Sequence, residues 1–231
     1  MKIKNIAGYK FAPLDELDAL RGEFLSMCQT LALKGTILLS PEGINIALSG
    51  KHENIAAFTT RLTTDARFND MDFRVSFSDT QIFQRMKVKL KKEIITMRHP
   101  EIKPTETRAP AISPVELKKW LDEQRDITVL DTRNDYEINY GTFRNAVNLH
   151  LKDFSEFPEA AKQVDQHKPI VMFCTGGIRC EKAALYMQNL GYDNVYQLEG
   201  GILNYFEQAG GAHYQGECFV FDERITCHPN T

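Results

Sequence analysis

The sequence lacks any apolar run of about 18 residues, the length that a membrane-spanning helix requires. Its first residues, Met1 to Leu14, include lysines and no long apolar segment of the kind found in signal peptides. The five cysteines are scattered through 231 residues without an export signal, so a disulfide framework is not expected. These absences predict a cytoplasmic protein that does not enter a membrane and keeps free thiols.

Signatures of common cofactors are also missing. The sequence has no dinucleotide-binding glycine fingerprint, no haem motif, and no spacing of histidines and carboxylates typical of non-haem iron. His213, Cys218, Cys227 and His228 include no Cys-x-x-Cys pair or zinc-finger spacing, so we interpret them as surface residues. No cofactor is evident, and no metal site is predicted.

One segment concentrates positive charge in a chain whose formal net charge is -3. Val88 and Leu90 alternate with lysines, so an extended backbone places those lysines on one face. Such a face can bind nucleic acid through phosphate contacts, although charge alone favours a simple solvated strand face. We call this set the basic strip; it consists of Lys87, Lys89, Lys91 and Lys92.

The first hundred residues alternate between helix and strand patterns around one hairpin. Pro41-Glu42-Gly43 predicts the hairpin turn, because its proline fixes φ and its glycine tolerates φ > 0. The order βαββαβ is that of a ferredoxin-like α+β sandwich. The predicted elements are a strand near Tyr9, helices near 17–31 and 55–62, and strands at 36–40, 44–48 and 73–77, the last one half-buried through Phe73, Val75 and Phe77.

Prolines mark the end of this first domain. Pro100, Pro104 and Pro110 lie in a polar stretch and disfavour continuation of a helix or sheet. We therefore predict an N-terminal domain at 1–97, a linker at 98–111, an α/β domain at 112–212 and a tail at 213–231.

The second domain begins with a clear helix start. Ser113 is the predicted N-cap, Pro114 occupies the first helical position, and Glu116 completes a capping box. Short apolar runs then predict a mainly parallel sheet that helices cover on both faces and that binds ligands beyond the C-terminal ends of its strands. The runs span residues 127–130, 146–149, 170–173 and 195–198.

Cys174 follows the strand at 170–173, at this ligand-binding end. Gly176 and Gly177 let the backbone curl so that several N–H groups point at one anion, and the following helix adds its positive dipole. With Arg179 nearby, these groups predict a lowered cysteine pKa and an exposed nucleophilic thiolate. A buried, inert thiol is the alternative interpretation. The predicted active-site loop is Cys174, Thr175, Gly176, Gly177, Ile178 and Arg179.

Three further residues support this loop in the prediction. Asp131 and Arg133 form either an ion pair that positions the loop or a purely structural bridge. Cys180, on the first helical turn, either resolves an oxidised Cys174 or packs as a small apolar side chain. The residues themselves leave both pairs of alternatives open.

The loop from Cys174 to Arg179 resembles the active-site loop of the rhodanese superfamily, in which the first cysteine carries a persulfide. Four residues separate its cysteine from its arginine, whereas cysteine-dependent phosphatases have five. Thr142 and Tyr205 depart from the usual rhodanese histidine and tryptophan, at positions that do not carry the sulfur chemistry. Other matching segments are Asp131-Thr132-Arg133, Glu137, Gly141, Asn145 to Leu149 and Leu198 to Ile202.

A narrower resemblance covers nearly the whole chain. The run Cys174 to Ala183, the hairpin Gly35 to Gly50 and the segment Phe219 to Arg224 resemble the rhodanese-domain tRNA uridine hydroxylases. This resemblance implies an acylphosphatase-like N-terminal domain, tRNA as partner, and 5-hydroxylation of the wobble uridine with dioxygen as co-substrate. It also gives the basic strip a role in RNA binding. The alternatives are a thiosulfate or persulfide sulfurtransferase acting through a Cys174 persulfide, and a non-catalytic binding module.

Overall fold

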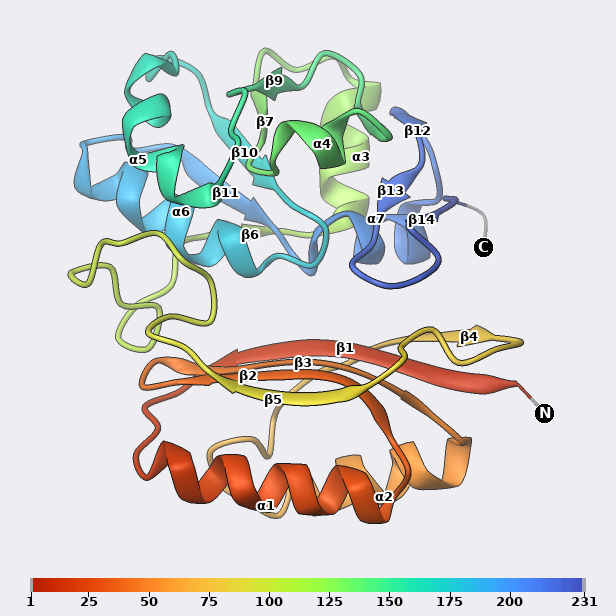
Figure 1. Ribbon diagram of the computed structural model, residues 1–231. Helices are drawn as coiled ribbons and strands as arrows, with labels where there is room; N and C mark the ends of the chain where they lie inside the picture. The colour runs from red at the N-terminus through yellow and green to blue at the C-terminus, as the bar shows by residue number, and fades with distance from the viewer. Residues whose placement is uncertain (1, 230–231) are drawn as a thin grey trace. The chain divides into compact units, whose positions relative to one another are not determined.

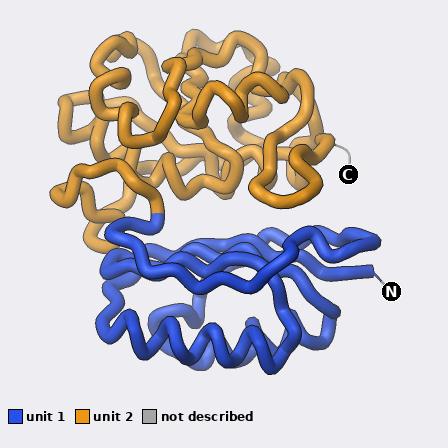
Figure 2. Tube along the Cα trace, viewed as in Figure 1, with its two compact units in different colours: residues 1–94 blue, residues 95–231 orange. Residues whose placement is uncertain are grey.

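A computed structural model describes residues 2–229. They form two compact units that divide between Ile94 and Ile95 (Figures 1 and 2). Each unit has its own sheet and its own buried core, and the order α+β domain followed by α/β domain is confirmed. Among the described residues, every helix is too short or too polar to span a bilayer.

The first unit is a five-stranded sheet packed against two helices (Figure 1). Its strand order is β4-β1-β3-β2-β5, and the predicted βαββαβ order is confirmed with one strand added. Alternate residues of the hairpin, such as Ile37 and Ile46, are fully buried because they face the helices. The elements are β1 Ile3–Phe11, α1 Leu17–Thr30, β2 Lys34–Ser40, β3 Gly43–Gly50, α2 His52–Leu62, β4 Arg74–Ser78 and β5 Met86–Leu90.

The added strand β5 forms one edge of this sheet and carries part of the basic strip. It pairs in parallel with β2, from Gly35↔Met86 to Leu39↔Leu90. Val88 is buried and both lysines next to it are exposed, so the alternation inferred from the sequence is confirmed. The other two lysines of the strip follow the strand and are also exposed.

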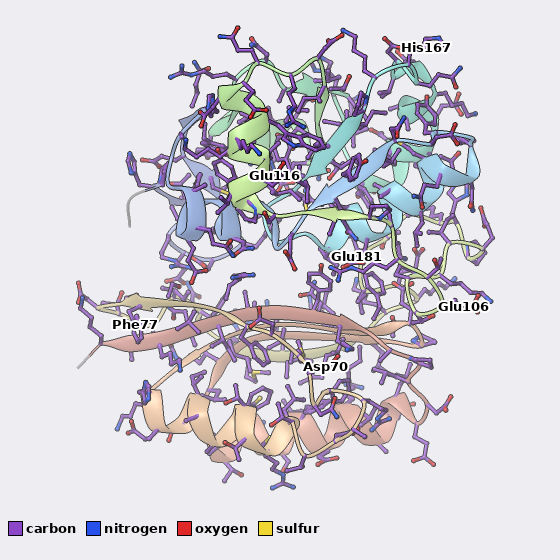
Figure 3. The ribbon with its side chains drawn as sticks, turned by 180° about the vertical axis from the view of Figure 1, so that it is seen from behind. Asp70, Phe77, Glu106, Glu116, His167 and Glu181 are labelled. Atoms are coloured by element: carbon purple, nitrogen blue, oxygen red, sulfur yellow. The ribbon has the colours of Figure 1, made fainter. Side chains whose placement is uncertain are left out.

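The opposite edge strand, β4, contradicts one expectation. Its apolar residues were predicted to face inward, but Val75 and Phe77 are 49% and 54% exposed. Figure 3 labels Phe77 on this strand. The strand does alternate with a period of two, as predicted, but its apolar side chains lie on the solvent-facing side and not on the core-facing side. The serine side of the strand turns inward because Ser78 Oγ accepts a hydrogen bond from Asn5 Nδ2 at 3.1 Å.

The second unit contains a five-stranded sheet of order β6-β11-β10-β7-β9, in which every pair is parallel. Ile170 and Met172 of β10 enter one core with α5 (Phe157–Ala160) and α6 (Ile178–Asn189). Val171 and Phe173 enter another core with α3 (Pro114–Asp122) and α7 (Gly201–Ala209). The prediction of a sheet covered on both faces is therefore confirmed. The sheet strands are β6 Ala111–Ile112, β7 Thr128–Asp131, β9 Val147–Asn148, β10 Ile170–Phe173 and β11 Val195–Leu198.

Shorter elements complete this unit. Two small antiparallel pairs, β8 with β12 and β13 with β14, bring the C-terminal segment into it. The helices are α3 Pro114–Asp122, α4 Asp135–Ile138, α5 Phe157–Ala160, α6 Ile178–Asn189 and α7 Gly201–Ala209, and the strands are β8 Gly141–Phe143, β12 Tyr214–Gly216, β13 Cys218–Phe219 and β14 Thr226–Cys227.

At the start of α3, the predicted N-cap at Ser113 and the proline at the first helical position are confirmed, but the predicted capping box is not formed, because the Glu116 carboxylate pairs with Trp120 instead. Ser113 Oγ accepts a hydrogen bond from the Glu116 amide at 3.2 Å, which satisfies one of the free N–H groups of the first turn. The Glu116 carboxylate, which Figure 3 places on α3, accepts a hydrogen bond from Trp120 Nε1 at 2.7 Å. That bond ties the helix to its own next turn.

The segment that precedes α3 belongs to the second unit. Met97, Ile102 and Ala109 are buried in the same core as α6. Lys182 Nζ donates to the Ile95 carbonyl at 3.0 Å and so fixes the start of the segment. The linker at 98–111 and the other domain boundaries read from the sequence stay predictions.

Candidate active site

Cys174 lies between the end of β10 and the start of α6, at the C-terminal edge of the parallel sheet. Its Sγ accepts a hydrogen bond from the Gly177 amide at 3.1 Å, so the loop does curl around the sulfur. Gly177 has φ of 95°, a left-handed conformation that glycine adopts without strain. A Cβ at Gly176, in contrast, would meet nothing within 4 Å. Only one of the two loop glycines is therefore required by the curl.

The environment of Cys174 favours its thiolate. Burial opposes ionisation, but the hydrogen bond with Cys180, the positive charge of Arg179 and the amides of Arg179 and Gly177 outweigh it and lower the pKa of Cys174 to about 6. The residue is only 2% exposed, so the expectation of an exposed sulfur was wrong. Cys174 belongs to the same core as Met172 and Cys180, and the loop curls around its sulfur.

Cys180 is a completely buried neighbour of that sulfur. Burial and the hydrogen bond with Cys174 raise the pKa of Cys180 well above its usual value, so it is a neutral thiol that can donate to the Cys174 thiolate. Its Sγ lies 3.6 Å from Thr132 Oγ1, which also donates to the Phe173 carbonyl at 3.0 Å. Cys180 is thus packed in the core and in contact with the reactive sulfur at the same time.

Arg179 is anchored by a buried carboxylate. Its Nη1 lies 2.8 Å from Oε2 of Glu137, a residue of α4 with no exposed surface. Burial disfavours the guanidinium charge, but Glu137 and the Cys174 thiolate together raise the pKa of Arg179. The same Glu137 oxygen accepts the Asn134 amide at 3.1 Å. Arg179 therefore carries a fixed positive charge next to the sulfur.

Asp131 and Arg133 form a second buried ion pair at the end of β7. The guanidinium reaches both carboxylate oxygens, with Nε 2.9 Å from Oδ1 and Nη2 2.7 Å from Oδ2. Nη2 also donates to the Gly141 carbonyl, and Thr142 Oγ1 donates to Asp131 Oδ2, each at 2.7 Å. Burial disfavours the guanidinium charge, but Asp131 outweighs it and raises the pKa of Arg133. Thr142, a departure from the rhodanese pattern, takes part in this pair.

The turn Gly200-Gly201, at the start of α7, places backbone amides that hydrogen-bond to the cysteine loop. The Ile202 amide donates to the Cys174 carbonyl at 2.9 Å and the Leu203 amide to the Thr175 carbonyl at 3.1 Å. Amides in the first turn of a helix have no acceptor within the helix, and here the first-turn amides of α7 bind the loop backbone instead. Gly201 has φ of 65°, and a Cβ there would lie 2.4 Å from the Cys174 carbonyl oxygen. The loop and this turn therefore fit together only with glycine at 201.

The C-terminal segment also reaches the loop. Cys218 and Cys227 lie opposite each other in the β13–β14 pair, and Cys218 Sγ is 4.0 Å from Thr175 Oγ1. Cys218 is fully buried, so its prediction as a surface residue was wrong: it belongs to the core that also contains Phe143, Tyr205 and Tyr214. Among residues 2–229, no three His, Cys, Asp or Glu side chains are grouped as metal ligands would be.

Comparison with known proteins agrees with this geometry. Residues 3–94 match the family described as UPF0176 acylphosphatase like domain, and residues 113–208 match the rhodanese-like domain. The tRNA uridine(34) hydroxylase of Cupriavidus pinatubonensis is 55% identical over 238 residues, which cover 100% of this chain and 84% of the relative. The chain belongs to the tRNA uridine(34) hydroxylase family.

Another member of the tRNA uridine(34) hydroxylase family, from Thiobacillus denitrificans, is 52% identical over 97% of this chain and 94% of its own length. A solved rhodanese-related protein from Thermoplasma volcanium is 28% identical over 43% of this chain and 93% of that one, with a TM-score of 0.38. The resemblance inferred from the sequence, and the acylphosphatase-like and rhodanese-like domains that it implied, are confirmed.

Two features of the site escape sequence reasoning. In the sequence, Glu137 stands out only as part of the rhodanese pattern, although it anchors Arg179. One signal for Glu137 was present in the sequence: it lies three residues after Asn134, at the start of a helix. A carboxylate at this N3 position turns back toward the N-cap residue. The sequence likewise shows Gly201 only as part of the double-glycine match and does not reveal that a Cβ there would meet the Cys174 carbonyl.

Proposed function

We propose that this protein hydroxylates C5 of uridine 34 in tRNA, with dioxygen as co-substrate and Cys174 as the catalytic thiol. The observation that carries the proposal is similarity to tRNA uridine(34) hydroxylases along the whole chain, combined with an intact thiolate-stabilising loop. Transfer RNA is the proposed partner, and the cytoplasm the proposed location.

The residues around Cys174 have distinct proposed roles. The Cys180 thiol, the Arg179 charge and the amides of the loop together hold the sulfur as an anion at neutral pH, where a thiolate is the nucleophilic and oxidisable form. Arg179 supplies a fixed positive charge, and Cys180 supplies a neutral thiol donor. The Asp131–Arg133 pair is proposed to position the strand end from which the loop departs. The basic strip is proposed to contact tRNA phosphates.

Sulfur transfer is the second candidate, and one contact favours it. A persulfide needs a cradle of N–H donors around an anionic sulfur, and the Gly177 amide points at Cys174 Sγ. In that activity, Cys174 would take sulfane sulfur from a donor and pass it to a thiol or cyanide acceptor.

Nucleoside mass spectrometry of tRNA separates these functions. In cells that lack the protein, we expect 5-hydroxyuridine and its derivatives to disappear and to return with the wild-type chain but not with Cys174→Ala. Cys28→Ala is the matched control, because burial raises the pKa of that thiol to about 12 and makes it inert. Loss of thiolated nucleosides would instead support sulfur transfer, and an unchanged profile would support a binding module. Hydroxylation restored by Cys174→Ala would refute the role of the thiol.

A further inference from the structure

Four aromatic rings gather beside the active-site loop. The Phe219 ring of β13 is their centre, with ring centroids 5.4 Å from Tyr136, 5.5 Å from Tyr140 and 5.1 Å from Phe221. Tyr136 lies on α4 and Tyr140 just after it, so two segments far apart in sequence build one cluster. We call these four residues the aromatic patch.

The aromatic patch is accessible. Phe221 is 58% exposed, and Tyr136 and Tyr140 are each 45% exposed. Single exposed apolar residues are ordinary on protein surfaces, but several in contact with one another mark a binding surface. The planes of Tyr136 and Phe221 stand at 86° and 87° to that of Phe219. Because these rings contact Phe219 edge to face rather than in a stack and keep about half of their surface open to solvent, a flat ligand can reach them.

The aromatic patch is continuous with the cysteine loop. The Phe221 ring centroid lies 5.8 Å from Cζ of Arg179, whose charge also acts on Cys174. On the other side, Thr175 Oγ1 donates to the Phe219 carbonyl at 3.5 Å. A ligand lying on these rings would therefore be next to the residues that surround the sulfur.

We propose that the aromatic patch stacks unpaired nucleobases of an RNA loop and holds the nucleotides that flank the reacting uridine. This proposal rests on the proposed function and names the form of RNA that the site accepts. Exposed aromatic rings beside an arginine are the side chains that bind bases of single-stranded RNA, since every base has a flat π face. Bases in a duplex are already stacked on one another and cannot lie on the rings, so the proposal predicts a preference for unpaired RNA.

Binding measurements on the full chain test this proposal. Fluorescence anisotropy would compare a labelled RNA hairpin with unpaired uridines in its loop and a fully paired duplex of the same base composition. We expect Phe221→Ala and Tyr140→Ala each to weaken hairpin binding about tenfold, with duplex binding unchanged. Phe221→Tyr and Tyr140→Phe keep a ring and should bind as the wild type does. Phe77→Ala is the matched control, because this aromatic residue is equally exposed but lies in the first unit (Figure 3).

The outcomes distinguish this proposal from the proposed function. Wild-type hairpin affinity in both alanine variants would refute base stacking, even if the protein hydroxylates tRNA in cells. Ring-dependent hairpin binding by a protein that leaves tRNA nucleosides unchanged would support the patch and refute the hydroxylase. An alanine variant that alters only the oligomeric state would show that another copy of the chain covers these rings, which also overturns the proposal.

Discussion

The ionisation of Cys174 makes a direct prediction about reactivity. A pKa of about 6, against an ordinary value of 9.0, leaves the residue about 90% thiolate at pH 7, where a free cysteine would be about 1% thiolate. The difference of about three pH units corresponds to about 4 kcal/mol in favour of the anion. Because the pKa is lowered, reactivity should be full above pH 7 and should fall as the pH drops through 6.

Pulsed alkylation with iodoacetamide across a pH series, followed by peptide mass spectrometry, measures this midpoint for each cysteine. Arg179→Gln should raise the midpoint of Cys174 because the buried Glu137 carboxylate then faces the sulfur without its counter-charge. That uncompensated charge costs about 3–5 kcal/mol, so circular dichroism must show that the variant is folded.

A double variant, Arg179→Gln with Glu137→Gln, removes both charges and keeps the test valid if the single variant unfolds. Its midpoint should still lie above that of the wild type, because the Arg179 charge lowers the pKa of Cys174 and its removal is the larger change at the sulfur. A wild-type midpoint near 9 would refute the stabilised thiolate. A midpoint that moves in neither folded variant would refute the electrostatic role of Arg179.

Two further predictions concern the turn behind the loop and the basic strip. Gly201→Ala should lower the free energy of unfolding, measured by chemical denaturation, by more than about 2 kcal/mol, because the new Cβ would meet the Cys174 carbonyl and the φ of residue 201 is left-handed. Gly176→Ala is the control and should change the free energy of unfolding by less than about 0.5 kcal/mol. Equal effects of the two substitutions would contradict the contact. Neutralising Lys87, Lys89 and Lys91 together should weaken tRNA binding and reduce the slope of log affinity against log salt by about two to three, and an unchanged slope would leave the strip as a solvated surface.

Local chemistry made much of the fold predictable from the sequence. The hairpin around Pro41-Glu42-Gly43 and the N-cap at Ser113 were readable because each depends on a few adjacent residues. Buried strands such as Ile170–Phe173 were readable as short apolar runs. The inward-facing side of β4 could not be predicted from the sequence, because a period of two does not indicate which side of an edge strand faces the core.

The candidate site was predictable only in part, for a related reason. The cysteine, the loop and the helix after it are contiguous, so their chemistry was visible in one stretch of sequence. The partners of the loop come from elsewhere in the chain: Glu137 from α4, Gly201 from α7 and Phe219 from β13. No local pattern states that these segments meet. The burial of Cys174 likewise depends on residues from other parts of the chain, such as Met97 and Leu130 in the same core.

The charges around Cys174 also show which groups must sustain its thiolate. Arg179 is already paired with Glu137, so the thiolate, the guanidinium and the carboxylate together carry one net negative charge in a buried site. One arginine shared in this way does not balance two anions. The remaining stabilisation must come from neutral donors, which are the Gly177 and Arg179 amides and the Cys180 thiol. The orientation of these donors toward the sulfur depends on the conformation of the loop backbone. The start of α7 fixes that conformation through hydrogen bonds to the Cys174 and Thr175 carbonyls. The geometry of the glycine turn is therefore part of what lowers the pKa of Cys174, although the turn contributes no charged side chain.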